Sequence, residues 1–157
     1  IYNGKLRQSL VRYKYYGCRE YGDYYADAVC KYTGKDIMRW KPDVIVPVPL
    51  TGRKQRMRGF NQSAYLADRV GEQLQIPVAY GLVKKTRNTK SQKKLNAAQR
   101  KQNLADAFRA EENIRGLTVL VIDDVYTTGS TVDAMAQCLK GAGAEQVYFI
   151  TLCAGQQ

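Results

Sequence analysis

The most informative absence in this sequence of 157 residues is histidine, of which it has none. A Ser-His-Asp or Cys-His nucleophile, a histidine general base and a histidine-ligated zinc ion are therefore excluded. The sequence also lacks an apolar run close to the ~18–20 residues that a membrane-spanning helix needs. It shows no basic and then apolar signal peptide. We therefore expect a cytoplasmic protein that does not insert into a membrane.

Cysteine is scarce, with four residues in the chain: Cys18, Cys30, Cys138 and Cys153. Because no two of them have the C-x-x-C spacing, a zinc ribbon is not expected. Cys138 and Cys153 lie in apolar stretches, where a thiol usually behaves as a small buried hydrophobe. We predict that all four are reduced and structural, with a disulfide as the alternative.

Acidic residues are also few, 14 against 25 Lys and Arg, so the formal net charge is +11. Such a balance favours a polyanionic partner, which is a nucleic acid, a phosphorylated metabolite or an anionic membrane surface. The stretch 73–105 contains no acidic residue, and it holds one of two basic clusters; the other is 53–58. Residues 84–94 carry almost no apolar side chains and are interpreted as a solvated loop.

The apolar residues that are present alternate between helical and strand patterns, which predicts one α/β domain over residues 1–157. We expect a mostly parallel central sheet with helices on both faces, and ligands at the carboxyl ends of its strands. Helical spacing covers 6–13 and 21–32, the latter ending at Gly34. The other predicted helices are 63–74, 96–105 and about 131–139, and the predicted strands are 44–48, 78–83, 118–122 and 147–152.

One segment, Val119–Thr131, carries most of the chemical information. An apolar strand is followed by Asp123 and Asp124, then by a hydroxyl-rich turn around Gly129, then by the start of a helix. Backbone N–H groups of such a turn bind anions, and the acids suit sugar hydroxyls or a hard cation such as Mg²⁺. The order predicts a sugar-phosphate site. Turn chemistry with an ordinary helix cap is the alternative.

This segment closely resembles the phosphoribosyl pyrophosphate (PRPP) signature of type I phosphoribosyltransferases. The resemblance implies that the acid pair holds the ribose hydroxyls, and Mg²⁺ mainly through PRPP, while the turn wraps the 5′-phosphate. The PRPP-binding residues implied are Asp123, Asp124, Val125, Tyr126, Thr127, Thr128, Gly129, Ser130 and Thr131. The catalytic residues implied are Asp123, Asp124, Arg53, Lys85 and Arg87.

A narrower resemblance, to the ComF/GntX branch linked to late competence, covers about residues 43–152. Its motif residues here are Arg56, Arg58, Gly59, Asn61, Gln62, Gln92, Arg100 and Asn103. By position, the resemblance implies that the pyrophosphate loop comprises Pro49, Leu50, Thr51, Gly52 and Arg53 and that 84–95 is the flexible loop. Residues 1–42 form a helical hood and 43–157 the α/β core. Many ComF-type proteins begin with a four-cysteine zinc module, which this sequence lacks. Because the chain starts at Ile1, we expect either that such a module is missing or that the protein is a short variant.

Two functions remain open at this point. The first is a Mg²⁺-dependent phosphoribosyltransferase that moves ribose 5-phosphate from PRPP to an amine or base and releases pyrophosphate. The second is a non-catalytic competence protein that binds single-stranded DNA during uptake, with PRPP as a regulator or relic. Tyr15 and Tyr16 are the candidate base contacts, whereas the spacing of Tyr13, Tyr21, Tyr25 and Tyr32 favours core packing. A homodimer or a partner from the competence machinery is also expected.

Overall fold

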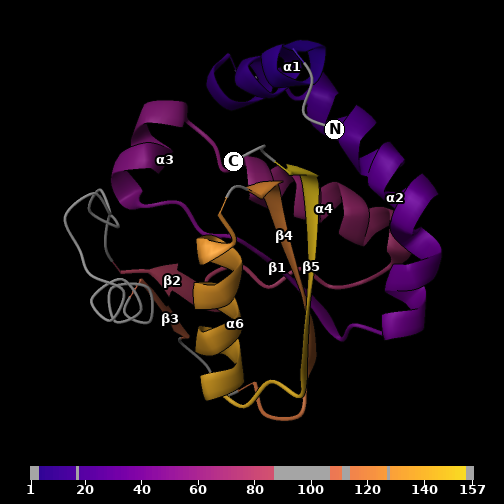
Figure 1. The fold of residues 1–157 in the computed structure, drawn as a ribbon, viewed down its shortest axis with the longest axis vertical. Coiled ribbons are helices and arrows are strands. Elements are labelled where there is room, and N and C mark those ends of the chain that lie inside the picture. Colours follow the sequence, from indigo (N-terminus) through magenta and orange to yellow (C-terminus); the bar gives the residue numbers. More distant parts are fainter. Residues whose placement is uncertain (1–3, 17, 87–106, 111–113, 127, 155–157) are drawn as a thin grey trace.

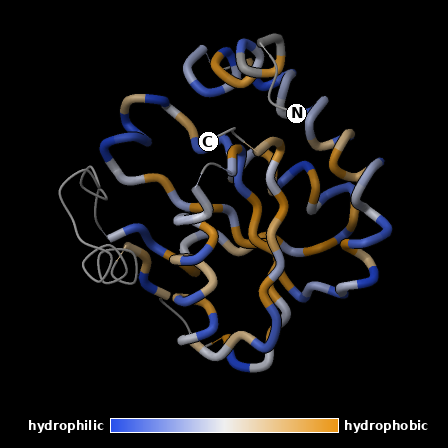
Figure 2. The backbone as a smooth tube through the Cα atoms, in the orientation of Figure 1, coloured by the Kyte–Doolittle hydropathy of each residue, from blue (hydrophilic) through white to orange (hydrophobic). Residues whose placement is uncertain are grey.

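The computed structural model describes residues 4–16, 18–86, 107–110, 114–126 and 128–154. Its central sheet is parallel and has the strand order β1 (Val44–Pro47), β4 (Thr118–Tyr126) and β5 (Gln146–Ala154). Val44 pairs with Val119, and Thr118 pairs with Gln146. A parallel sheet covered on both faces requires nearly continuous apolar strands, and Figure 2 shows such apolar colour along them. The α/β fold with a parallel sheet is confirmed.

Alternate residues of these strands belong to two hydrophobic clusters, one on each face of the sheet. Val46 and Val121 pack with α6 (Ser130–Gly141) in one cluster. Ile45 and Leu120 pack with α2 (Glu20–Trp40) and α4 (Gln62–Leu74) in the other. The two-residue period of a strand produces this division. It confirms that helices cover both faces.

The N-terminal helices form the expected hood. Helix α1 (Gly4–Tyr15) lies above the arrowheads of β4 and β5, and α2 runs down beside the sheet (Figure 1). The prediction that the second helix ends at Gly34 is wrong, because it continues to Trp40. Gly34 is buried and faces Leu74 of α4, so tertiary packing outweighs its low helix propensity. The Trp40 ring stacks on Tyr148 of β5, with ring centroids 4.6 Å apart.

The predicted strand 78–83 is also wrong in its bounds. Only Val78 forms a bridge, to Ile45, whereas β2 is Val83–Lys85 and pairs antiparallel with β3 (Phe108–Ala110). Between Val78 and β2 the chain turns at Gly81, whose φ of +77° interrupts the extended backbone. Residues 84 and 85 are therefore part of a strand rather than of a solvated loop. The rest of that loop and the predicted helix 96–105 lie outside the described residues.

Helix α3 (Gly52–Arg58) was not predicted. The Thr51 side chain accepts a hydrogen bond from the N–H of Lys54, at 3.5 Å, and caps the helix. All four cysteines are free, as predicted. None of the helices in the described parts of the chain is long and apolar enough to cross a membrane.

Candidate functional site

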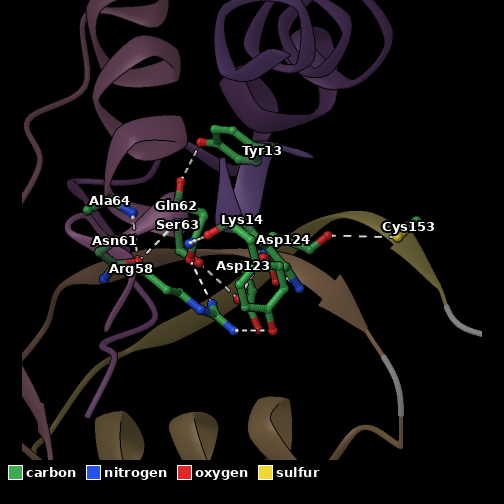
Figure 3. A network of polar contacts seen from close by, with 11 residues as sticks. Tyr13, Lys14, Arg58, Asn61, Gln62, Ser63, Ala64, Asp123, Asp124 and Cys153 are labelled. Atoms are coloured by element: carbon green, nitrogen blue, oxygen red, sulfur yellow. Dashed lines mark hydrogen bonds and ion pairs between the residues drawn. The ribbon is translucent and has the colours of Figure 1, made fainter. Parts of the chain in front are cut away.

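The polar side chains of the predicted site gather at the carboxyl end of β4, beneath α1 (Figures 1 and 3). The strand is longer than predicted. It extends to Tyr126 because its pairing with β5 continues through Asp123↔Thr151 and Val125↔Cys153. Both acids therefore lie within the strand, not in the turn after it. Since neighbouring strand residues point to opposite faces, the two carboxylates have different partners.

Asp123 is a partly buried carboxylate held by two hydrogen bonds. The Ser63 hydroxyl donates to its Oδ1 at 2.9 Å, and the backbone N–H of Asp124 donates to the same oxygen at 2.8 Å. Burial, and then the charge of Asp124, raise the pKa of Asp123 to about 6, although both hydrogen bonds and Lys14 oppose the shift. Proton uptake by this carboxyl is therefore expected near neutral pH. Ser63 was not among the predicted site residues.

Asp124 is buried and pairs with the hood. The ammonium of Lys14, near the end of α1, lies 2.9 Å from its Oδ2. The Cys153 thiol donates to its backbone oxygen at 3.9 Å. Lys14 is 110 positions away in the sequence and stands among tyrosines, so no spacing rule pointed to this pair.

The predicted phosphate turn leads into α6. Gly129 caps the helix with φ +77°, and the hydroxyls of Thr128 and Ser130 lie 2.9 Å apart. This positive φ favours glycine, and a Cβ at the position would also come within 2.7 Å of the Tyr126 hydroxyl, so the tyrosine side chain would have to move. Tyr126 is 40% exposed. Val125 and Thr131 are partly buried, and Thr127 lies outside the described residues.

Lys85 lies within electrostatic range of Asp123 and of a second lysine, Lys54. Burial lowers the pKa of Lys85 in β2, Lys54 in α3 lowers it further, and Asp123 opposes both effects. The lysine of the predicted loop therefore has a second lysine within electrostatic range. Arg53 is exposed in the first turn of α3. Lys54 was not predicted, because nothing in the basic cluster 53–58 indicates which of its residues lies near Lys85.

The remaining motif residues build the support of the site. Asn61 caps α4 by accepting from the N–H groups of Ser63 and Ala64, and its Nδ2 donates to the Val48 carbonyl at 3.1 Å. Arg58 donates to Oε1 of the buried Gln62 at 3.0 Å. These bonds tie the helix that presents Ser63 to the end of β1.

The other predicted positions have plainer roles or are not described. Gly59 ends α3 with φ +75°, and Arg56 is exposed on that helix. Pro49 and Leu50 are partly buried and lead to the cap of α3. The predicted residues outside the described part of the chain are Arg87, Gln92, Arg100 and Asn103.

The donor set of the site suits a hard cation only in part. Carboxylate oxygens are what Mg²⁺ prefers, and it takes six ligands. The described residues contain no group of three or more acidic, cysteine or histidine side chains placed to hold a metal. A cation on Asp123 and Asp124 would therefore complete its shell with oxygens of water or of a bound ligand.

The comparison with protein families defines the class. Residues 23–157 match the model of the phosphoribosyl transferase domain. The chain therefore belongs to this family, and its parallel sheet, paired acids and glycine turn are the features that the resemblance predicted.

The chain is also similar to proteins named for DNA utilization and for competence. It is 43% identical to the DNA utilization protein YhgH of Salmonella typhi over 112 residues, covering 71% of this chain and 49% of that protein. Competence protein F of Haemophilus influenzae is 36% identical, with 68% and 48% covered. Competence protein ComFC of Bacillus subtilis is 30% identical, with 90% and 56% covered. The chain thus spans about half the length of these relatives.

Solved structures agree on the fold. Purine phosphoribosyltransferase from Pyrococcus horikoshii superposes with a TM-score of 0.54 at 20% identity, covering 83% of this chain and 73% of that one. Glutamine phosphoribosylpyrophosphate amidotransferase from B. subtilis gives 0.50 at 24% identity, covering 71% of this chain and 22% of that one. At these identities the likeness extends to the fold alone.

Proposed function

We propose that this domain binds PRPP with Mg²⁺ and transfers its phosphoribosyl group to an amine or base. The observation that carries the proposal is the juxtaposition at the end of β4. There Asp123 and Asp124 precede the turn at Gly129, and Lys85 lies within electrostatic range of Asp123 and of Lys54. Acids, a turn before a helix and lysines are groups that suit the ribose, the 5′-phosphate and the pyrophosphate of the ligand.

Each group has a distinct role in this proposal. The carboxylates accept hydrogen bonds from the ribose hydroxyls, and Ser63 orients Asp123 for this purpose. The N–H groups at the start of α6 bind the 5′-phosphate. Lys54 and Lys85 stabilise charge on the leaving pyrophosphate. The acceptor nitrogen donates its lone pair to ribose C1, the bond from C1 to the pyrophosphate oxygen breaks, and the acceptor loses a proton.

Bound Mg²⁺ supplies charge neutralisation for the pyrophosphate when it leaves. Asp123 and Asp124 are the residues that would hold it. Because they provide too few oxygens to complete its shell, the fit is to a cation that arrives with the ligand.

PRPP binding is tested by thermal unfolding of the whole chain. PRPP with Mg²⁺ is expected to raise the Tm, since a ligand of the native state stabilises it by mass action. The double variant Asp123→Asn with Asp124→Asn should lose the shift. Asp36→Asn should keep it, because its carboxylate is exposed on α2 and pairs with Arg39 of the same helix. An unchanged Tm of the wild type would contradict the proposal.

Transfer itself needs a second assay. Incubation with PRPP and candidate amines or bases should release pyrophosphate only when an acceptor is present. PRPP binding without release for any acceptor would favour the non-catalytic function.

The second candidate function, binding of single-stranded DNA, has one observation in its favour. Tyr15 and Tyr16 are 61% and 74% exposed, as predicted, and the Arg58 guanidinium lies 5.0 Å from the Tyr15 ring centroid. Exposed aromatic rings beside cations are the elements of a single-strand binding surface. The similarity to the DNA utilization protein YhgH also supports DNA as a partner.

This candidate is tested with the double variant Tyr15→Ala, Tyr16→Ala. Affinity for a labelled oligonucleotide should fall by about tenfold or more, since each stacked base contributes ~1–3 kcal/mol, and wild-type affinity should fall with salt. Tyr80→Ala is the matched control, because Tyr80 is 60% exposed between α4 and β2. Equal loss in both variants, or no binding at low salt, would exclude this surface.

A further inference from the structure

The contact between Lys14 and Asp124 has no role in the proposed transfer. It is not an ordinary surface ion pair, because the two side chains are only 20% and 11% exposed. Exposed pairs contribute little, since water screens the charges and two long side chains lose freedom. Because both side chains are mostly buried, water screens this pair less and the two side chains have less freedom to lose. The pair also joins two parts of the molecule, the N-terminal helix and the central strand.

The position of Lys14 is set by packing on both sides. The preceding residue, Tyr13, is fully buried, and its hydroxyl donates to the Gln62 carbonyl at 2.7 Å. The Gln62 side chain in turn donates from Nε2 to the Lys14 carbonyl at 3.1 Å (Figure 3). The end of α1 is therefore tied to the first residue of α4. The backbone of Lys14 is thereby fixed beside the acid pair, within reach of the Asp124 carboxylate.

The Lys14 ammonium occupies one oxygen of the acid pair and offsets part of its negative charge. Lys14 engages Oδ2 of Asp124, while the Ser63 hydroxyl and a backbone N–H engage Oδ1 of Asp123. One oxygen of each carboxylate is thus already used. Lys14 also cancels one of the two negative charges that would otherwise attract a free divalent cation.

We propose that Lys14 is a built-in counter-cation that keeps the acid pair from binding a divalent cation alone, so that the cation binds together with its anionic ligand. This inference rests on the proposed function, and Lys14 then determines specificity. Its consequence for the free protein does not depend on transfer. Without the ammonium, two adjacent carboxylates would attract a divalent cation directly.

The test compares Mn²⁺ binding to the whole, ligand-free chain by titration calorimetry. Lys14→Met removes the charge and keeps a side chain of similar length. It should bind Mn²⁺ at least about tenfold more tightly than the wild type, because a unit charge of like sign is removed from within ~4 Å of the site. Lys14→Arg keeps the charge and should bind like the wild type. Lys35→Met, an exposed lysine of α2, is the matched control.

Equal or weaker Mn²⁺ binding by folded Lys14→Met would overturn the inference. If Lys14→Met does not fold, as judged by circular dichroism, Lys14→Gln takes its place in the same comparison. The effect of PRPP on Mn²⁺ affinity is the second readout, and it should be smaller in Lys14→Met than in the wild type. If PRPP does not bind the wild type, the proposed function fails, whereas Mn²⁺ binding without PRPP still decides the role of Lys14.

Discussion

Individual residues at this site are defined by partners that come from distant parts of the chain. Asp123 accepts from Ser63, 60 positions earlier, and Asp124 pairs with Lys14 from the hood. Burial without a full counter-charge makes the ionised form of Asp123 costly, which is why its pKa lies well above the usual range. In its ionised form this residue therefore lowers the stability of the fold.

A first prediction follows for Asp123. Its pKa is 3.8 in an ordinary setting and about 6 in the folded protein, so the neutral form stabilises the fold. This stability is fully present below pH 3.8 and is lost as the pH rises through about 6. Asp123→Asn should therefore unfold at higher urea than the wild type at pH 8, with a gain on the order of 1–3 kcal/mol.

Urea unfolding at pH 4, 6 and 8 checks this expectation. The gain should shrink toward pH 4, where the wild-type carboxyl is already neutral. Asp36→Asn, at an exposed position of α2, should show no such trend. A gain of the same size at every pH would contradict the assignment.

At the scale of elements, α4 connects the chemistry to the sheet. Its cap, Asn61, accepts from two backbone N–H groups of the first turn and also donates to Val48 at the end of β1. The next two residues contact the hood and the acid pair, through Gln62 and Ser63 respectively. The first residues of α4 therefore contact the end of β1, the hood and the acid pair, and fix these three parts relative to one another.

Asn61→Ala is expected to lower the free energy of unfolding by about 1–3 kcal/mol, because it removes both the cap and the bond to the Val48 carbonyl. Asn61→Asp keeps an acceptor for the cap but has no donor for Val48, so its loss should be smaller. Urea unfolding at pH 7 measures both. Equal losses in the two variants would show that the cap does not contribute.

At the scale of the whole molecule, the hood and the sheet share one hydrophobic cluster. Leu10 of α1 is 1% exposed and packs in the same cluster as Ile45 and Leu120. The expected boundary between residues 42 and 43 therefore separates two parts of a continuous core. We predict that residues 1–157 unfold as a single domain.

Leu10→Ala tests this prediction, since it creates a cavity where the hood packs against the sheet. The free energy of unfolding should fall by about 2–5 kcal/mol, and Trp40 fluorescence and circular dichroism should report one coincident transition. Val11→Ala is the control, because Val11 is 40% exposed on the same helix. A separate early loss of helical signal, with the Trp40 transition unchanged, would show that the hood unfolds alone.

The sequence was most informative where structure depends on neighbours along the chain. The apolar runs of β1 and β4 predicted a parallel sheet, because strands buried on both faces need such runs. The acids followed by Gly129 predicted the site, because a strand, a turn and a helix start must be contiguous. Periodicity also located the buried Tyr13 and Tyr25.

Periodicity failed where a helix face meets no partner. Tyr32 has the spacing of a core residue but is 76% exposed on α2, so its predicted burial is wrong. The local pattern states which residues share a face, whereas the packing of the elements decides whether that face is covered.

Only the tertiary structure decided which charges meet. Lys14 reaches Asp124, and Lys54 lies within electrostatic range of Lys85, although neither pair is close in sequence. A basic residue has the same sequence signature whether it faces water or a buried carboxylate, since its partner is brought by the order of strands and helices. The sequence by itself determined the order of strand, acid pair, glycine turn and helix. The fold determined the charge of that site, because the hood places one ammonium on its acid pair.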